Sequence, residues 1–164
     1  MMARMSHRVR QFVGALRPHV ADGERADAYR YLNADQQRLF ESMMLRDQQH
    51  GIEVYRHVRA AAAADLALFT AALLHDSGKG DVRLWQRVAY VALGAGAPSL
   101  LSRLASERGA GWRQAFHRLL HHPDIGADLA AAAGADADVV RMIREQDAAA
   151  PDGRLALLQA ADEA

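Results

Sequence analysis

Residues 65–80 read DLALFTAALLHDSGKG and combine an apolar helical segment with an adjacent His–Asp pair. Asp65 is a favourable N-cap residue, and Gly78 is a favourable residue beyond a helix C-terminus, so we predict a helix from 66 to about 75. His75 and Asp76 follow this apolar run directly. Packing of the run would therefore fix the direction of both polar side chains.

Glycines, prolines and capping residues divide the rest of the chain into further helices. We predict helices at 6–16, 24–31, 33 or 35 to about 64 with a break near Arg46, 82–93, 98–107, 112–121, 124–133, 139–146 and 152 to the C-terminus. No segment alternates apolar and polar residues over five positions, so we predict no sheet. The expected fold is all-α: a single compact multi-helix bundle, with N-terminal helices in 1–45 packing on a core unit in 46–164.

Composition excludes several classes of function. The 164 residues include 20 Lys or Arg and 20 Asp or Glu. This zero net charge argues against a general nucleic-acid-binding protein, so we expect no nucleic-acid polymer as partner. The chain has no cysteine, which excludes disulfides, zinc–thiolate sites and cysteine nucleophiles. No apolar run approaches the roughly 18 residues that a membrane helix needs, and no signal peptide is visible, so we expect a cytoplasmic protein without a membrane partner.

Histidines and carboxylates stand at four places in helical segments and form a candidate metal site. They are His50, the pair His75–Asp76, His122 in a His-Pro-x-x-Gly element, and Asp162 after an apolar run. Neutral imidazoles and carboxylates are ligands for divalent transition metals, and helices can bring them together in a bundle interior. Lys79 is the chain's single lysine and follows Asp76 by three residues, which suggests that an ammonium group is required there.

In order and context these residues resemble the HD-domain phosphohydrolases over about residues 47–163. The resemblance implies a divalent metal ion (Mn, Fe, Co, Ni, Zn or Mg) held by His50, His75, Asp76 and Asp162. His122 would serve a second ion, as in HD domains of the HD-GYP type. Gln146 stands where a further histidine is expected, which favours one ion. The Gly-Tyr-Pro signature is absent, so we do not assign cyclic-di-GMP as substrate.

The resemblance implies hydrolysis of a small phosphate ester, such as a nucleotide or related metabolite. Asp76 would act as general base or orient the attacking hydroxide, and Lys79 would contact the substrate phosphate and offset its charge. We expect Arg46 to bind substrate, and Arg83, Arg87 and Arg118 are further phosphate anchors to consider. The alternative is a non-catalytic module that binds a metal or nucleotide. Trp85 and Trp112 could stack on a base, but their helical spacing favours core packing.

Overall fold

The computed structural model describes residues 20–62 and 64–164, and the described part is helical without any β-strand. The fold is therefore all-α, as the sequence predicts. The predicted helix at 6–16 lies outside the described residues. The elements are α2 (Asp22–Tyr29), α3 (Ala34–Ser42), α4 (Leu45–Ala61), α5 (Leu66–Leu74), the 3-10 turn η1 (Ser77–Lys79), α6 (Leu84–Gly96), α7 (Pro98–Leu104), α8 (Gly111–Ala132), α9 (Ala137–Arg144) and α10 (Gly153–Asp162).

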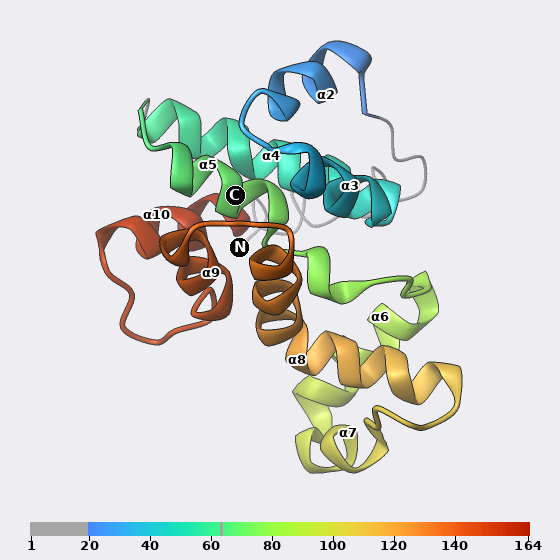
Figure 1. Ribbon diagram of the computed structural model, residues 1–164. Coiled ribbons are helices and arrows are strands. Elements are labelled where there is room, and N and C mark those ends of the chain that lie inside the picture. Colours follow the sequence, from blue (N-terminus) through green and yellow to red (C-terminus); the bar gives the residue numbers. More distant parts are fainter. Residues whose placement is uncertain (1–19, 63) are drawn as a thin grey trace.

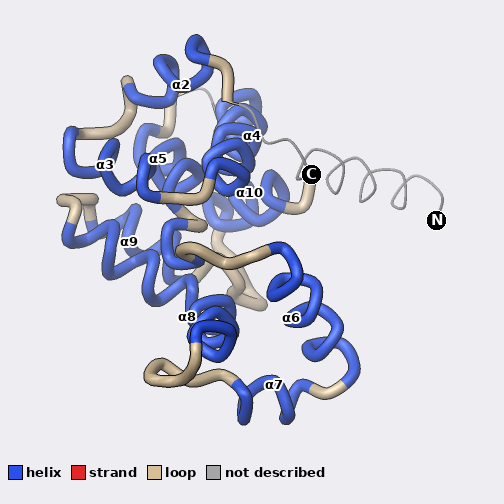
Figure 2. The backbone as a smooth tube through the Cα atoms, turned by 90° about the vertical axis from the view of Figure 1, so that its right-hand side faces the viewer, coloured by secondary structure: helices blue, strands red, loops and turns tan. Residues whose placement is uncertain are grey.

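The helices form two regions that α8 joins (Figure 1). We call residues 20–62, 64–80 and 122–164 the body, and residues 81–121 the α6–α7 lobe. The body contains α2 to α5, the second half of α8, α9 and α10, and the lobe contains α6, α7 and the first half of α8. Figure 2 shows the lobe projecting from one end of the body.

Helix α5 is the central element of the body. All its residues from Leu68 to Leu74 are buried, and they pack in one continuous core with side chains of α2, α3, α4, α8, α9 and α10. Each fully buried Leu or Phe contributes about 1.5–3 kcal/mol through the hydrophobic effect. Asp65 caps the helix as predicted, because its carboxylate accepts a hydrogen bond from the Leu68 N–H at 3.0 Å. The most apolar segment of the chain thus ends, at His75, in the interior.

Helix α8 has a kink close to the helix boundary that the sequence predicts. Two helices are predicted, at 112–121 and 124–133, and α8 consists of two helical segments that follow one another across His121, whose backbone is non-helical (φ −117°, ψ 15°). Pro123 has no N–H to donate to the carbonyl of Leu119, four residues earlier. The Nδ1 of His122 donates to that carbonyl instead, at 3.0 Å. The proline thus bends the helix without ending it, and the freed acceptor orients a histidine.

The remaining boundaries follow the prediction closely. The long region from residue 33 divides into α3 and α4 at Met43 and Met44, and Asn33 caps α3 through hydrogen bonds to two backbone N–H groups. Asp152 caps α10, as expected from the sequence. None of the described helices combines the length and apolar character needed to span a bilayer.

Candidate metal centre

Four predicted ligands come together where three parts of the body meet. His50 lies on α4, His75 and Asp76 connect α5 to η1, and Asp162 ends α10. Asp162 Oδ1 is 2.6 Å from Nε2 of His50 and 3.2 Å from Nε2 of His75. Nε2 of His75 is 3.3 Å from Asp76 Oδ1. One potential ligand atom each from His50, His75 and Asp76 also lies within 4.8 Å of the other two.

Hydrogen bonding fixes which atom of His75 faces this cluster. Its Nδ1 lies 2.9 Å from the carbonyl oxygen of Ala72, and because a carbonyl can only accept, Nδ1 must carry the proton. In the neutral ring Nε2 then presents its lone pair to the other three side chains. A second imidazole nitrogen bonded to a backbone carbonyl is the usual arrangement of a metal-binding histidine.

Two buried atoms at the centre of the cluster lack a hydrogen-bond partner within the described residues. They are Nε2 of His75 and Oδ1 of Asp76, on side chains that are both 2% exposed. A buried polar atom without a partner costs about 1–3 kcal/mol, so such atoms call for a ligand. Two imidazoles and two carboxylates are a donor set that divalent transition metals bind. The residues present therefore fit a divalent metal ion.

The electrostatics also favour a positive charge at the centre. Burial acts to raise the pKa of Asp76, but His75 and Lys79 hold it well below its usual range. The pKa of Asp162 is likewise lowered against the effect of burial, by its hydrogen bond with His50 and the proximity of His75. Burial acts to lower the pKa of His75, but Asp76 and Asp162 outweigh it and the net shift is upward. Two carboxylates that stay ionised in the interior attract a cation, either an imidazolium or a metal ion.

Lys79 lies at the edge of the cluster and is largely buried. Its ammonium group donates a hydrogen bond to Asp76 Oδ2 at 2.6 Å, which leaves Oδ1 directed to the histidines. The turn that carries Lys79 packs directly on α8. A Cβ at Gly78 would lie 2.1 Å from the His122 carbonyl oxygen and 2.6 Å from the Gly126 nitrogen, so only glycine allows this approach.

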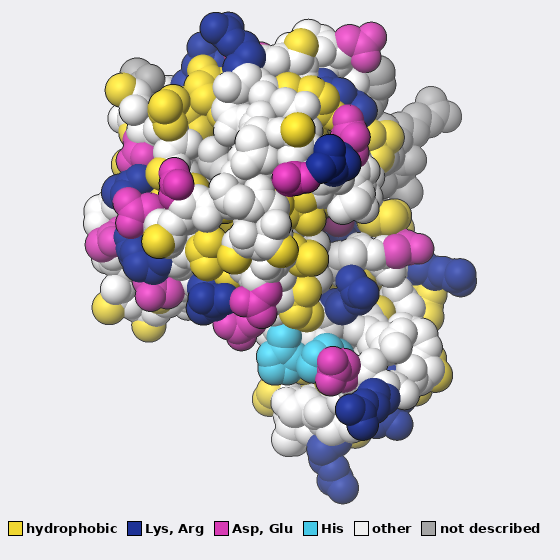
Figure 3. Space-filling model, viewed as in Figure 1, with side chains coloured by type: hydrophobic (Ala, Val, Ile, Leu, Met, Phe, Trp, Pro, Cys, Tyr) yellow, Lys and Arg dark blue, Asp and Glu magenta, His cyan; other side chains and the backbone are white. Residues whose placement is uncertain are grey.

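The structure separates the two adjacent histidines of α8. Nε2 of His122 lies 3.9 Å from Asp76 Oδ1. Burial and the nearby Lys79 lower the pKa of His122, which keeps its ring neutral near pH 7. His121 is exposed and its ring lies 4.6 Å from that of His117. Histidine is visible at the surface where the body meets the lobe (Figure 3). His122, and not His121, is therefore next to the cluster.

Gln146 occupies a structural position beside the cluster. Its side-chain amide donates to the carbonyl of His75 at 3.2 Å, and its own carbonyl accepts from Gln159 at 2.9 Å. The residue thus connects the end of α5 to α10, which supplies Asp162. The amide contact that the structure records for Gln146 is with backbone, through Nε2.

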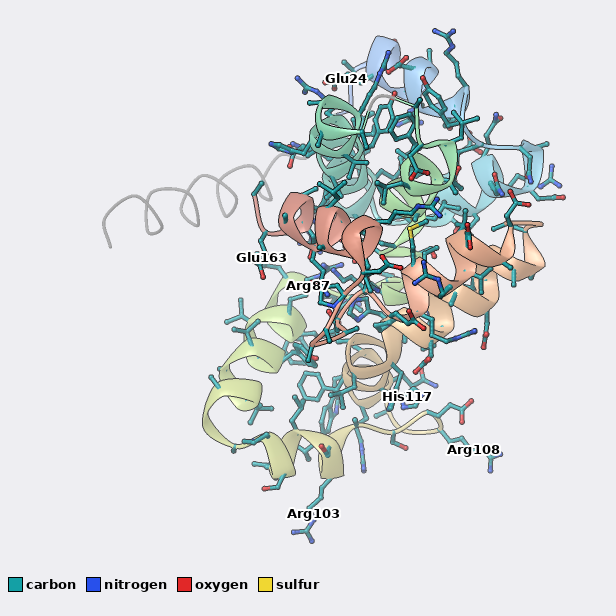
Figure 4. The ribbon with its side chains drawn as sticks, turned by 90° about the vertical axis from the view of Figure 1, so that its left-hand side faces the viewer. Glu24, Arg87, Arg103, Arg108, His117 and Glu163 are labelled. Atoms are coloured by element: carbon teal, nitrogen blue, oxygen red, sulfur yellow. The ribbon has the colours of Figure 1, made fainter. Side chains whose placement is uncertain are left out.

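Two arginines, Arg46 and Arg87, lie on the side of the site that faces α6. Arg46 precedes His50 by one helical turn and donates to the Val82 carbonyl at 3.3 Å. Arg87 is ion-paired with the buried Asp47 at 2.6 Å, and Figure 4 shows its side chain between α10 and α6. Burial and the charge of Arg87 lower the pKa of Arg46, and Asp47 acts in the opposite direction.

Two further residues near these arginines were not predicted as functional from the sequence. Asp47, three residues before His50, is buried and holds Arg87 in place. Tyr90 of α6 lies within electrostatic reach of the site: burial raises the pKa of its hydroxyl, Asp147 raises it further, and Lys79 acts in the opposite direction. The i, i+3 spacing of Asp47 and His50 on a predicted helix would have been a usable signal for Asp47. No local pattern points to Tyr90.

Comparison with known proteins gives no match: no family model, no curated protein and no solved structure is significantly similar to the chain.

Proposed function

We propose that this chain is a cytoplasmic, HD-type, metal-dependent phosphohydrolase that acts on a small phosphate ester such as a nucleotide. The observation that carries the proposal is the pair of buried, unpartnered atoms, His75 Nε2 and Asp76 Oδ1, with His50 and Asp162 around them. This order and placement of ligands supports the resemblance to HD domains. The zero net charge supports a small substrate rather than a nucleic-acid polymer.

His50, His75, Asp76 and Asp162 would hold one divalent ion. When bound, the ion supplies Lewis acidity toward a phosphoryl oxygen and toward water. His75 is directed by its Nδ1–H bond to Ala72, and Asp162 by the end of α10. Asp162 is 47% exposed while His75 is 2% exposed, so water and substrate would reach the cluster from the side of Asp162.

Asp76 and Lys79 would act together on the reacting groups. A carboxylate whose pKa is held far below its usual range is a weak base, so Asp76 is suited to orient the attacking water rather than to deprotonate it. The Lys79 ammonium, 2.6 Å from Asp76 Oδ2, would offset negative charge that develops on the phosphoryl group.

Arg46 and Arg87 would bind the phosphate of the substrate. Both carry a buried Nε without a hydrogen-bond partner within the described residues, so each guanidinium retains capacity for an anion. Arginine can bind phosphate through two parallel hydrogen bonds. Neutral His122 next to Asp76 is placed to serve a second ion or to accept a proton.

The second candidate is a non-catalytic module that binds a metal or nucleotide. Gln146 favours it, because an amide bonded to backbone stands where the resemblance leads us to expect a further histidine ligand. The two functions differ in turnover of a phosphate ester.

Metal analysis of the purified protein, followed by a screen of generic and nucleotide phosphoesters, tests the proposal. The protein is stripped with a chelator and reloaded separately with Mn, Fe, Co, Ni, Zn and Mg. We expect His75→Ala and His50→Ala to lose the metal and to lower turnover about 10³-fold, since a metal contributes several kcal/mol to the transition state. His57→Ala is the matched control, because His57 is exposed on the same helix as His50. A wild-type protein that binds no metal contradicts the phosphohydrolase, one that binds neither metal nor nucleotide contradicts both candidates, and a metal-loaded protein without turnover supports the non-catalytic module.

A further inference from the structure

A cavity of about 490 Å³ opens in the α6–α7 lobe, outside the candidate metal centre. One wall is formed around the start of α6 and the other by the first half of α8. Its volume falls within the range of about 300–1,000 Å³ that is typical of small-molecule sites. None of the proposed metal ligands lines it. The side chains that line it include Arg83, Trp85, Gln86, Trp112, Gln114 and Arg118.

The chain has two tryptophans, and both line this cavity. The expectation that they pack in the core is wrong: Trp85 is 54% exposed and Trp112 is 37% exposed. No helix among the described residues forms a second layer over these side chains, so the helical spacing that suggested a core face leaves them at the surface. Exposed indole rings in a concave site are suited to stack on a planar aromatic ligand.

Arginine supplies positive charge on each wall of the cavity. Arg83 and Arg118 are exposed, and no ion pair is recorded for either side chain within the described residues. Arg118 packs against Gly80, whose φ of +62° favours glycine; a Cβ there would lie 2.3 Å from Arg118 Nη1. Asp81 also lines the cavity and offsets one of the two charges. The charge that remains suits a ligand with a single phosphate group better than a polyanion.

Two glutamine amides add hydrogen-bonding capacity of opposite kinds. Gln86 accepts from the backbone N–H of Arg83 through Oε1 at 2.7 Å, which leaves its N–H groups as donors. Gln114 donates through Nε2 to the Glu107 carbonyl at 3.1 Å, which leaves its Oε1 as an acceptor. A donor and an acceptor beside aromatic rings are what the edge of a nucleobase requires.

We propose that this cavity is a binding site for a nucleoside monophosphate, separate from the metal centre. The base stacks on Trp85 and Trp112 and bonds to the two glutamines, and Arg83 and Arg118 bind the phosphate. Asp81 follows Lys79 by two residues, and Arg118 precedes His122 by about one helical turn. A ligand held here therefore contacts both chain segments that lead into the metal centre.

Intrinsic tryptophan fluorescence reports on this cavity directly, because it contains both fluorophores. The probes are AMP, adenosine and ribose 5-phosphate, titrated into the full chain after metal removal, with calorimetry as a second measurement. We expect AMP to quench the fluorescence saturably and to bind at least about tenfold more tightly than adenosine or ribose 5-phosphate, since each lacks one of the two recognised groups. Equal weak binding of all three, or no binding, overturns the proposal.

Variants assign the binding to the proposed side chains. The double variant Arg83→Gln with Arg118→Gln should weaken AMP binding about tenfold or more, as expected for the loss of charged hydrogen bonds. Arg103→Gln with Arg108→Gln is the matched control on the same lobe, where Figure 4 shows both side chains directed away from the molecule. Trp85→Phe and Trp112→Phe should each leave a fluorophore whose emission AMP still quenches. Equal weakening in the two double variants would overturn the site.

A nucleoside monophosphate could be the enzyme's substrate or an effector, and the variant Asp76→Asn distinguishes these two roles. We expect this variant to bind AMP with unchanged affinity, because Asp76 does not line the cavity. A tenfold change in affinity in either direction would mean that the ligand reaches the metal centre, which overturns the separate site. The result does not depend on turnover, so the proposed hydrolase function can fail while this site stands, and the reverse.

Discussion

The body and the α6–α7 lobe differ in how their apolar side chains are covered. In the body, α5 is enclosed by other helices, and its residues from Leu68 to Leu74 are buried. In the lobe, a small cluster of Val82, Ala115 and Leu119 with Tyr90 packs between α6 and α8. Five of the nine large apolar side chains most exposed in the described part of the chain belong to the lobe: Trp85, Val88, Val91, Leu100 and Trp112.

This difference matches the two kinds of site that we propose. Metal ligands must be held within a few tenths of an ångström, and the body supplies close packing on every side of His75 and Asp76. A stacking site needs exposed aromatic faces instead, which the thin lobe leaves uncovered. Rigidity and exposure thus reside in different regions, joined at η1 and the kink of α8.

The largest expected effect is on the contact between η1 and α8. Gly78→Ala places a methyl group 2.1 Å from a backbone oxygen of α8, which cannot move aside as a side chain can. We expect a loss of about 3 kcal/mol or more in the free energy of unfolding, measured by urea denaturation. Gly96→Ala in the lobe is the control, since a Cβ there meets nothing within 4 Å. Similar losses in the two variants would contradict the contrast between body and lobe.

The second-largest effect is expected for Lys79, which lies at the junction between the body and the lobe, and it is measured as a change in kcat/KM. Lys79→Ala should lower kcat/KM about 10²-fold on the phosphoester that the screen returns, as for removal of one group that stabilises transition-state charge. Metal content should change little, because the ammonium is not a proposed ligand, while the free energy of unfolding should fall because the buried Asp76 carboxylate loses its ion pair. Lys79→Arg should not fully restore activity, since a guanidinium has a different size and shape. Wild-type kcat/KM in Lys79→Ala would show that the lysine is incidental.

Local sequence signals predict the body better than the lobe. The apolar run before His75 and the caps at Asp65 and Asp152 act within one helical turn, and the structure has the helices that they predict. Pro123 was interpreted as a helix start, and the helix is broken two residues before it, at His121. Trp85 and Trp112 were assigned to the core because periodicity shows a face and not what covers it.

The arrangement of the candidate site needed more than local pattern. The resemblance to HD domains selected His50 and Asp162, which are 112 positions apart and come within 2.6 Å. Periodicity alone would not pair them. The contact between Asp65 and Arg154, across 89 positions, has no sequence signature, yet it fastens the helix that ends in Asp162. Long-range ion pairs of this kind depend on the packed fold.

That ion pair gives the third expected effect and a pH dependence. Burial acts to raise the pKa of Asp65, but Arg154 and the backbone N–H of Leu68 outweigh it, so the pKa in the folded state is lowered. A lowered folded-state pKa stabilises the protein above the unfolded value of about 3.9, and this contribution is lost as pH falls through the folded-state pKa. We expect Arg154→Ala to cost about 1 kcal/mol at pH 7, since solvent screens the partly exposed pair.

Urea denaturation of the wild type and Arg154→Ala at neutral and acidic pH measures this contribution. The difference between the two should shrink as the pH falls below about 4, where Asp65 becomes protonated in the unfolded chain. Arg103→Ala serves as control, because no ion pair of Arg103 is recorded in the part of the chain that the structure describes. A difference that stays constant with pH would mean that Arg154 stabilises α10 by packing alone.

The smallest expected effect is that of a valine in the lobe, Val91, for which a valine of the body, Val54, is the comparison. Val54 on α4 is 1% exposed, and Val91 on α6 is 67% exposed. Val54→Ala should cost about 2 kcal/mol, since it removes buried methyl groups and leaves a cavity. Val91→Ala should stay within about 0.5 kcal/mol of the wild type, because alanine's higher helix propensity offsets the little burial that is lost. Thermal and urea denaturation of both variants at several protein concentrations measure the difference. A cost above about 1 kcal/mol for Val91→Ala that grows with concentration would mean that another copy of the chain covers the outer face of α6, and the lobe would then not be the exposed region on which the comparison rests.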